Sequence, residues 1–233
     1  MFCSIIVCAY NHLRDLTIPC LQHVRKHTSF PHELVLVDDG STDDTFRYFR
    51  SVAPQSYRIP QNAGIAYARN AGLRMARGHW IAFIDNDITV TPGWLTRLIQ
   101  RAQSDNIGIA GALPDNEIFR RNRALSGDGT IESQEIGGGC LLMPRRVFNR
   151  IGYLDTNLSH HGEDTDYCYR ARLAGYRVVL IPEVVVHHQN HGTLADPELQ
   201  EKRIQSLAYF RAKWLPAQSI YGNAFPVPEM GIL

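Results

Sequence analysis

Hydrophobic residues along the chain gather in short unbroken runs, most of them followed by polar or acidic residues. The runs lie at 4–9, 34–37, 80–84, 107–112, 141–143, 178–181 and 184–186, and a short strand is also expected near 57–60. Runs of this length are typical of strands buried on both faces, as in the middle of a parallel sheet. Stretches with helical character lie at 13–27, from about 44, and at 62–72, 93–102, 145–151, 164–174 and 197–214. This alternation predicts an α/β fold with a Rossmann-like, mostly parallel central sheet flanked by helices.

The composition changes this picture only by excluding other classes of protein. The chain has 233 residues, 44% of them hydrophobic, which suits one soluble domain with a sizeable core. Its formal net charge of +1 gives no electrostatic reason to expect a nucleic acid partner. No apolar run is long enough to span a bilayer, and residues 1–9 lack the features of a secretory signal. The five cysteines form no CxxC pair, so we expect reduced core residues of a cytoplasmic protein.

The stretch WIAFIDND, residues 80–87, is the first candidate for chemistry. Five apolar residues run directly into Asp85 and Asp87, two carboxylates spaced two apart. Side chains alternate along a strand, so these two are expected to point the same way and Asn86 away from them. Ligands of open α/β sheets bind beyond the carboxyl ends of the strands, where a carboxylate pair can hold a hard cation. A cap on the helix that begins near 92–94 would explain one aspartate but not both.

The ends of the first two strands indicate which ligand this edge of the sheet would bind. Tyr10 and Asn11 follow the first strand without any glycine, which argues against a dinucleotide-binding turn. The second strand ends in DDGSTDDT, residues 38–45, which is typical of a capped turn into a helix. Such a turn does not account for Asp38 and Asp39 side by side. A carboxylate there can accept the imide N–H of uracil or thymine, or the N–H edge of guanine.

A further helix opens at NAGIAYARNAG, residues 62–72. Gly64 allows close backbone approach, and a helix N-terminus favours anionic groups. Arg69 stands one turn further along, where it can reach a phosphate or pair with an aspartate. An arginine on a helix is more often a solvated surface residue, so this position alone decides nothing.

The second half of the chain offers candidates for proton transfer and metal binding. Glu163 and Asp164 stand where a helix begins, and N-capping is the ordinary role of an acidic residue there. A carboxylate at a helix N-terminus also stays ionised, as a general base for a hydroxyl must. His187, His188 and His191 follow the last strand with no cysteine nearby. This favours one histidine ligand on a carboxylate-bound metal over a zinc site.

Seven stretches together resemble the family 2 glycosyltransferases, in the same order. They are SIIVCAYN, VLVDDGSTDDT, NAGIAYARNAG, WIAFIDND, GGGCLLMPRRVFNRIGYLD, GEDTDYCYRARLAGY and PEVVVHH. The resemblance covers roughly residues 3–190. Its second half is most similar to the branch of rhamnosyl-, galactofuranosyl- and related polysaccharide transferases. It implies a GT-A fold and an inverting, metal-dependent enzyme that uses a nucleotide-diphosphate sugar.

The resemblance implies which positions bind the donor. The nucleotide-sugar-binding positions are Ala9, Tyr10, Asp38, Asp39, Asn62, Gly64, Arg69, Asp85 and Asn86. Ala9 and Tyr10 would line the base pocket, and Asp39 would accept the imide N–H. Asp85 and Asp87 match the DXD motif, whose first acid faces ribose and sugar.

The resemblance also implies metal ligands and a catalytic base. The metal, Mn²⁺ or Mg²⁺, would be held by Asp87, Asp85 and His188, with His187 as the fallback. Asp164 matches the catalytic base, and Glu163 would help to position the acceptor.

We therefore expect transfer of a sugar from a UDP- or dTDP-sugar to a hydroxyl of a glycan or lipid-linked saccharide, in polysaccharide biosynthesis. The enzyme would be cytoplasmic, with peripheral contact to the inner face of the membrane. A sugar-phosphate nucleotidyltransferase would need a glycine-rich loop after the first strand, which is absent at 10–12. A non-catalytic sugar-nucleotide-binding module would lack the base or the metal-binding acids, and here all are present.

The expected domain organisation follows the motifs. Residues 1–190 would form the glycosyltransferase domain, with a nucleotide-sugar-binding half at 1–100 and an acceptor-binding half at 101–190. Residues 113–135 are polar and without period, and we expect a mobile loop that covers the substrate. A C-terminal helix at 197–214 would pack onto the body, followed by a loosely held tail at 215–233.

Overall fold

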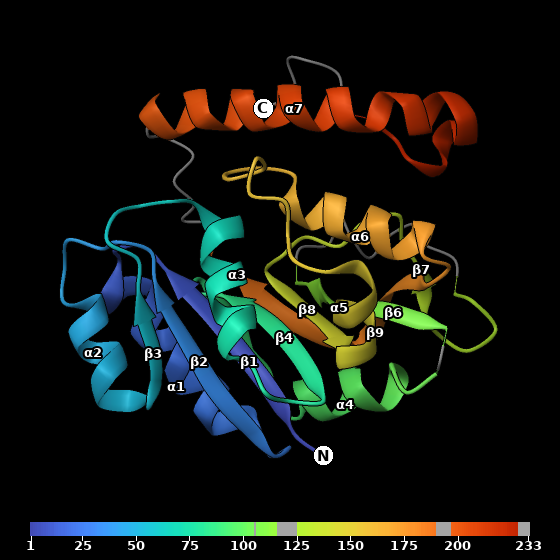
Figure 1. The fold of residues 1–233 in the computed structure, drawn as a ribbon. Coiled ribbons are helices and arrows are strands. Elements are labelled where there is room, and N and C mark those ends of the chain that lie inside the picture. Colours follow the sequence, from blue (N-terminus) through green and yellow to red (C-terminus); the bar gives the residue numbers. More distant parts are fainter. Residues whose placement is uncertain (105, 116–124, 190–196, 228–233) are drawn as a thin grey trace.

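A computed structural model describes residues 1–104, 106–115, 125–189 and 197–227, and the structural statements below concern these ranges. They contain one nine-stranded sheet with helices on both faces (Figure 1). Its strands are β1 (Cys3–Ala9), β2 (His32–Asp38), β3 (Gln55–Arg58), β4 (Trp80–Asp85), β5 (Ile88–Val90), β6 (Ile107–Pro114), β7 (Ile131–Glu132), β8 (Cys140–Pro144) and β9 (Arg177–His188). The apolar runs therefore form strands, as the sequence predicts.

The strand order is β3-β2-β1-β4-β8-β6-β9-β5, and β7 pairs with β9. Strands β1, β2, β3 and β4 are parallel to their neighbours among themselves, and β6 is parallel to β9. Strand β8 runs antiparallel to both β4 and β6, while β5 and β7 run antiparallel to β9. The predicted α/β fold with a mostly parallel sheet is confirmed, and its N-terminal half carries the carboxyl ends of β1, β2 and β4 on one edge.

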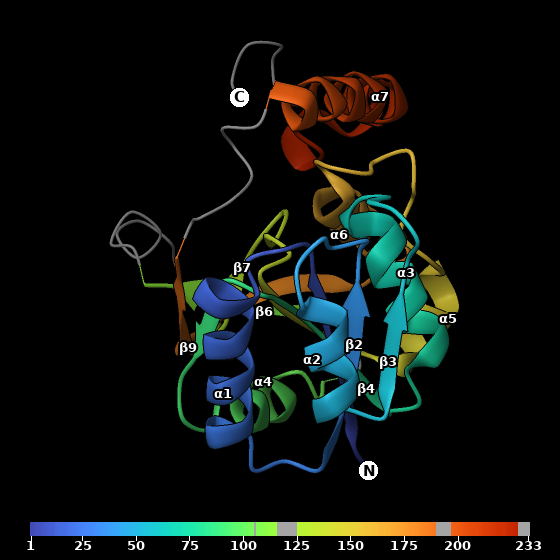
Figure 2. The ribbon, with the colours of Figure 1, turned by 90° about the vertical axis from the view of Figure 1, so that its left-hand side faces the viewer.

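Helices cover the two faces of the sheet in separate layers (Figure 2). They are α1 (Ile18–His27), α2 (Thr45–Val52), α3 (Ile65–Met75), α4 (Trp94–Arg101), α5 (Arg145–Ile151) and α6 (Glu163–Leu173). Helices α1, α2 and α4 share one hydrophobic cluster with one face of the sheet, and α3, α5 and α6 share a second with the other. Because strand side chains alternate, Ile5 and Val7 of β1 join the first cluster while Ile6 and Cys8 join the second.

Helix α7 (Pro197–Tyr221) lies outside these layers, across α6 (Figure 1). It packs through an aromatic cluster, and the buried members of this cluster are Leu158, Tyr169, Phe210, Trp214 and Phe225. The indole N–H of Trp214 also donates to Oδ1 of Asp166 at 3.0 Å. The predicted helix therefore exists but extends to Tyr221, through Pro216, so residues 215–221 are not the loosely held tail that we expected. Residues 228–233 of that tail lie outside the described ranges.

The region between β6 and β8 also differs from the sequence prediction. The short strand β7 pairs with β9 inside the predicted loop 113–135, and residues 116–124 of that loop lie outside the described ranges. The two strands predicted at 178–181 and 184–186 form one continuous strand, β9. The register between β6 and β9 shifts between Ala112 and Leu113, and Pro182 of β9 lies at this irregularity. A bulge tolerates proline, which has no backbone N–H to donate.

Two expectations from the composition can be compared with the structure. All five cysteines are free thiols and buried, and burial raises the pKa of each thiol. They are therefore core residues, as predicted. Among the described residues, no helix has both the length and the apolar character needed to cross a bilayer.

Candidate active site

A cavity of about 280 Å³ opens at the carboxyl ends of β1, β2 and β4. Side chains from α3, from the start of α6 and from the first turn of α7 complete its walls. The predicted site residues that line it are Ala9, Tyr10, Asp39, Asn62, Gly64, Arg69, Asp85, Asn86, Asp87, Glu163 and Asp164. The structure thus brings together residues from both halves of the chain.

Asp39 is buried at the base of this cavity, at the N-terminus of α3. Its Oδ1 accepts a hydrogen bond from the backbone N–H of Ala63 at 2.9 Å. Its Oδ2 accepts from the N–H of Gly64 at 2.9 Å and from Nδ2 of Asn62 at 3.1 Å. Burial is the main cause that raises the pKa of Asp39 to about 6, and the charge of Asp38 adds to it. Asp39 is therefore already engaged within the chain, and a nucleobase would have to use its remaining lone pairs.

Asp38 does not line the cavity. Its side chain is fully buried, and its Oδ1 accepts from the backbone N–H of Ser41 at 2.9 Å. The Nε atom of Arg58 lies 3.5 Å from its Oδ2. The structure therefore places Asp38 in the support of the turn that follows β2, and not beside Asp39 in the cavity.

Gly64 is needed at its position for two reasons. Its φ of 91° lies in the region that favours glycine. A Cβ atom there would also lie 2.4 Å from the carbonyl oxygen of Ser159. The close approach predicted from the sequence therefore exists, between the start of α3 and the segment before α6.

Arg69 is the most heavily engaged side chain of the site, and it is only 2% exposed. Its Nη2 donates to Oδ1 of Asp85 at 2.7 Å and to the carbonyl oxygen of Gly138 at 3.0 Å. Its Nη1 donates to Oε1 of Glu163 at 2.9 Å, and its guanidinium lies over the ring of Phe83. The solvated surface role considered for Arg69 is therefore wrong, and pairing with an aspartate is what the structure shows.

Glu163 and Asp164 are adjacent in sequence but have different surroundings. Glu163 is 6% exposed and bound to Arg69, and burial together with the charge of Asp164 raises its pKa to about 8. Asp164 borders the cavity, and its Oδ2 accepts from the N–H of Gly138 at 2.7 Å. The N-cap position of α6 is occupied by Gly162, so capping does not account for Asp164.

The DXD stretch does not continue as a strand in the way that simple alternation predicts. Strand β4 ends at Asp85, and Asn86 and Asp87 form a turn before β5. All three residues line the cavity, and the side chain of Asn86 reaches toward the start of α1. Its Nδ2 donates to Oγ1 of Thr17 at 3.0 Å, which fixes the turn against the start of α1.

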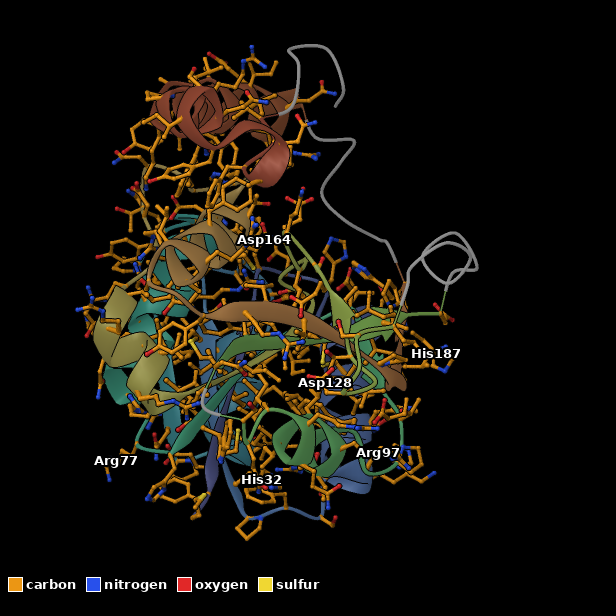
Figure 3. The ribbon with its side chains drawn as sticks, turned by 90° about the vertical axis from the view of Figure 1, so that its right-hand side faces the viewer. His32, Arg77, Arg97, Asp128, Asp164 and His187 are labelled. Atoms are coloured by element: carbon orange, nitrogen blue, oxygen red, sulfur yellow. The ribbon has the colours of Figure 1, made fainter. Side chains whose placement is uncertain are left out.

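His188 is the histidine that the structure brings to the DXD stretch. Its Nε2 lies 3.1 Å from Oδ2 of Asp87, and this contact raises the pKa of the imidazole. His187 points elsewhere and pairs with Asp115 (Nδ1 to Oδ2, 2.5 Å) at the outer edge of the sheet, away from Asp164 (Figure 3). His191 lies outside the described residues.

The residues present offer a partial set of ligands for a divalent cation. In the described part of the chain, no group of three His, Cys, Asp or Glu side chains is arranged to hold a metal ion. Asp87 and His188 nevertheless provide a carboxylate oxygen and an imidazole nitrogen within hydrogen-bond distance of each other. This donor pair suits Mn²⁺ if other ligands, such as diphosphate oxygens, come from outside the chain.

A second cavity, of about 440 Å³, lies on the other side of the segment 138–139. Its walls are mostly apolar, with Ile88, Ala112, Pro114, Ile136, Leu180 and Val186 among the residues that line it. Asp85, Gly138 and Asp164 border both cavities. These three residues therefore form the partition between them.

Sequence reasoning missed several residues of the first cavity. They are Cys8, His12, Leu16, Ile65, Ala68, Gly138, Ser159, His160 and Leu199. His12 and Leu16 reach it because Asn11 and His12 have positive φ and the chain then enters a π-helical turn, Leu13–Thr17. No sequence signal indicated that Leu199 of α7 would come so close.

A family model and a curated relative each match most of this chain. The sequence model of the family described as "Glycosyl transferase family 2" matches residues 4–159. The putative polypeptide N-acetylgalactosaminyltransferase 13 of Drosophila melanogaster is 25% identical over 222 residues, which cover 77% of this chain and 40% of that protein. The chain thus spans well under two thirds of the length of this relative.

Solved structures share the fold at low sequence identity. The crystal structure of GalNAc-T7 with UDP, GalNAc and Mn²⁺ has a TM-score of 0.72 and 16% identity, covering 98% of this chain and 52% of that one. The mannosyltransferase PcManGT from Pyrobaculum calidifontis, in complex with GDP-Man and Mn²⁺, has a TM-score of 0.70 and 19% identity, covering 93% and 64%. At these identities the likeness concerns the fold.

Proposed function

The chain belongs to glycosyl transferase family 2, and from this membership we propose that it is an inverting, metal-dependent glycosyltransferase. It would transfer a sugar from a nucleotide-diphosphate donor, with UDP- or dTDP-sugars favoured, to a hydroxyl of a glycan or lipid-linked saccharide. The observation that carries this proposal is the position of Asp164, whose carboxylate borders both cavities. A general base must stand between the donor and the acceptor, and Asp164 would have that position if one cavity takes each substrate. The finer similarity to rhamnosyl- and galactofuranosyl-type polysaccharide transferases, and the cytoplasmic location, stay predictions.

The first cavity is suited to the donor. Ala9 and Tyr10 stand at the end of β1, and the start of α3 presents Asn62 and Gly64 to the same space. Helix N-termini favour phosphate groups, but here Asp39 already occupies the backbone donors of Ala63 and Gly64. We therefore assign this end of α3 to the nucleoside part of the donor and the DXD end of the cavity to the diphosphate.

Asp87 and His188 would hold the divalent cation. When bound, the cation would neutralise charge on the diphosphate and so stabilise the leaving nucleotide. Asp85 has a different task, because its Oδ1 is bound to Arg69. We assign to Asp85 the orientation of the donor at the partition between the cavities.

The second cavity is suited to the acceptor. A hydroxyl group entering from that side would meet Asp164, which removes its proton as the oxygen attacks the anomeric carbon from the face opposite the leaving group. One such displacement inverts the anomeric configuration, and a base of this kind contributes roughly 10²–10⁴-fold to the rate. Glu163 points at Arg69, so we assign it to holding the arginine and not to positioning the acceptor, as the resemblance had implied.

The domain division would follow the cavities. The donor side would come mainly from residues 1–100 and the acceptor side mainly from residues 101–190. The mostly apolar wall of the second cavity suits the carbon-rich face of a sugar ring, while the carboxylates at the partition suit its hydroxyls.

A binding screen tests the proposal. UDP, dTDP and GDP would be added to the protein with Mn²⁺ or with excess EDTA, and the melting temperature measured. A ligand that binds only the folded state raises its stability, so one nucleotide should raise the melting temperature with Mn²⁺ but much less with EDTA. Release of that nucleotide from its sugar conjugate would then distinguish an enzyme from a non-catalytic module. Absence of any nucleotide effect would contradict the proposal.

A further inference from the structure

Gly138 lies at the partition between the two cavities and makes hydrogen bonds through both its backbone carbonyl and its backbone N–H. Its carbonyl oxygen accepts from Nη2 of Arg69 at 3.0 Å. Its N–H donates to Oδ2 of Asp164 at 2.7 Å. A single residue therefore connects the buried arginine with the proposed catalytic base.

The arginine end of this connection is fixed on the donor side. The same guanidinium binds Asp85 of β4 at 2.7 Å and Glu163 of α6 at 2.9 Å. The next peptide along, at Gly139, accepts a hydrogen bond at its carbonyl from the N–H of Asp85 at 3.0 Å. The segment 138–139 is thus bound to the first acid of the DXD stretch through its backbone and through Arg69.

Space at Gly138 is too small for any side chain. A Cβ atom there would lie 2.3 Å from Nη2, 2.4 Å from Nη1 and 2.7 Å from Cζ of Arg69. The adjacent residue differs sharply, since a Cβ atom at Gly137 would meet only Oδ2 of Asp164, at 4.0 Å. Because the Arg69 side chain is buried among its partners, it cannot move aside without breaking the bonds to Asp85 or Glu163.

We propose that Gly138 and Arg69 are positioning residues, which set where the Asp164 carboxylate stands relative to Asp85 and therefore to the donor. The inference rests on the proposed function. Arg69 holds the peptide, and the peptide N–H holds one oxygen of the base, so the donor side and the base move as one unit. Reactions lose rate steeply when reacting groups are misplaced by about 1 Å. Displacing this peptide should therefore slow transfer without removing any group that touches the substrate.

The neighbouring glycines supply a matched pair of variants. Gly138→Ala forces the clash with Arg69, while Gly137→Ala adds the same methyl group one residue away. Affinity would be measured by calorimetry with UDP or GDP in the presence of Mn²⁺. Turnover would be measured as release of the nucleoside diphosphate from UDP-glucose, UDP-N-acetylglucosamine and GDP-mannose. Gly138→Ala should lower kcat by roughly 10²-fold with nucleotide affinity within twofold of the wild type. In Gly137→Ala the methyl group would lie at ordinary contact distance from Asp164, so kcat should fall far less than in Gly138→Ala, with the same nucleotide affinity.

A double variant tests whether Gly138 acts through Arg69. Arg69→Lys keeps the charge but loses the fork that reaches three acceptors at once. If Gly138 acts through Arg69, the double variant should have nearly the same kcat as Arg69→Lys alone. If the two residues act independently, the fold-losses in kcat of the two single variants should multiply in the double variant. This comparison also serves if Gly138→Ala alone folds poorly, because the shorter lysine relieves the clash.

The outcomes separate this inference from the function on which it rests. Equal turnover in Gly138→Ala and Gly137→Ala would overturn the positioning role while leaving the transferase proposal intact. Loss of nucleotide affinity in proportion to kcat would also overturn it, because the defect would then lie in donor binding. A wild-type protein that binds none of UDP, dTDP and GDP, and releases none of them from a nucleotide sugar, would overturn both.

Discussion

Nε2 of His188 lies 3.1 Å from Oδ2 of Asp87, although the two residues are 101 positions apart in the sequence. The antiparallel pairing of β5 with β9 creates this contact, because it sets His188 opposite Ile88, the residue next to Asp87. The same register places His187 opposite Thr89, where it pairs with Asp115 instead. Adjacent histidines on one strand thus have different surroundings, which makes each a control for the other.

Removing His188 should therefore weaken metal binding specifically. In His188→Ala we expect the affinity for Mn²⁺, measured by calorimetry at saturating UDP, to fall by about 10-fold or more, the loss that even an outer partner of a metal can cause. His187→Ala should leave the affinity within twofold. Equal Mn²⁺ affinity in the two variants would show that His188 is not a ligand.

Asp164→Asn tests the base. The amide keeps the shape of the side chain and one acceptor oxygen, which can still bind the Gly138 N–H in place of the N–H of Thr165, but it cannot accept a proton from the acceptor. Turnover should fall by roughly 10²–10⁴-fold while UDP affinity stays within twofold. Asp128→Asn, a change in an exposed ion pair with Arg177, should leave both unchanged. Near-normal turnover in Asp164→Asn would assign the proton transfer to another group.

Asp39→Asn should affect both the fold and the donor. An amide presents one acceptor atom to the N–H groups of Ala63 and Gly64 where the carboxylate presents two, so unfolding free energy should fall by about 1–3 kcal/mol. If Asp39 also reads the base, UDP affinity should fall in the folded variant. Chemical denaturation and calorimetry on the same preparation measure the two effects. An unchanged UDP affinity would leave Asp39 with the structural role alone.

Glu163 should make stability depend on pH. Burial raises its folded pKa to about 8 from an ordinary value near 4.5, so the folded state binds this proton more tightly than the unfolded state does. Its favourable contribution is complete below about pH 4.5 and is lost as the pH rises through about 8. Relative to Glu163→Gln, which does not titrate, the wild type should therefore lose stability between about pH 4.5 and 8.

Urea unfolding of both proteins across this range gives the difference directly. Asp39 has a shift of the same sign but is present in both proteins, so its effect cancels. A difference that stays constant with pH, or grows in favour of the wild type at high pH, would contradict the raised pKa.

The sequence predicted the strands and the acids that follow them because both are local properties. A run such as 80–84 can hardly be anything but a buried strand, and the carboxylates after it must stand at one edge of the sheet. The antiparallel placement of β8 could not be predicted, because it depends on where the chain returns after residues 101–139. The turn at 86–87 was missed because alternation assumes that a strand continues.

The ion pairs of the site could not be predicted from local sequence patterns either. The candidate partners of Arg69 were stated only as a phosphate or an aspartate; Asp85 is such a partner, but the second partner, Glu163, lies 94 positions away. Whether a helical arginine is solvated or buried depends on the segments folded over it, which no local pattern reveals. Leu199 is a similar case, since an apolar residue in an amphipathic helix ordinarily belongs to a packing face.

Leu199 has a practical consequence for protein engineering. Helix α7 is attached to α6 by the aromatic cluster around Trp214, and its first turn forms part of the wall of the first cavity. A boundary near residue 190, which the motifs favour, would therefore cut through that wall. A chimera that exchanges the segment after that boundary would replace part of the proposed donor site as well. Hybrid enzymes made to alter acceptor choice are better joined after Phe225, which is a buried member of the cluster that attaches α7.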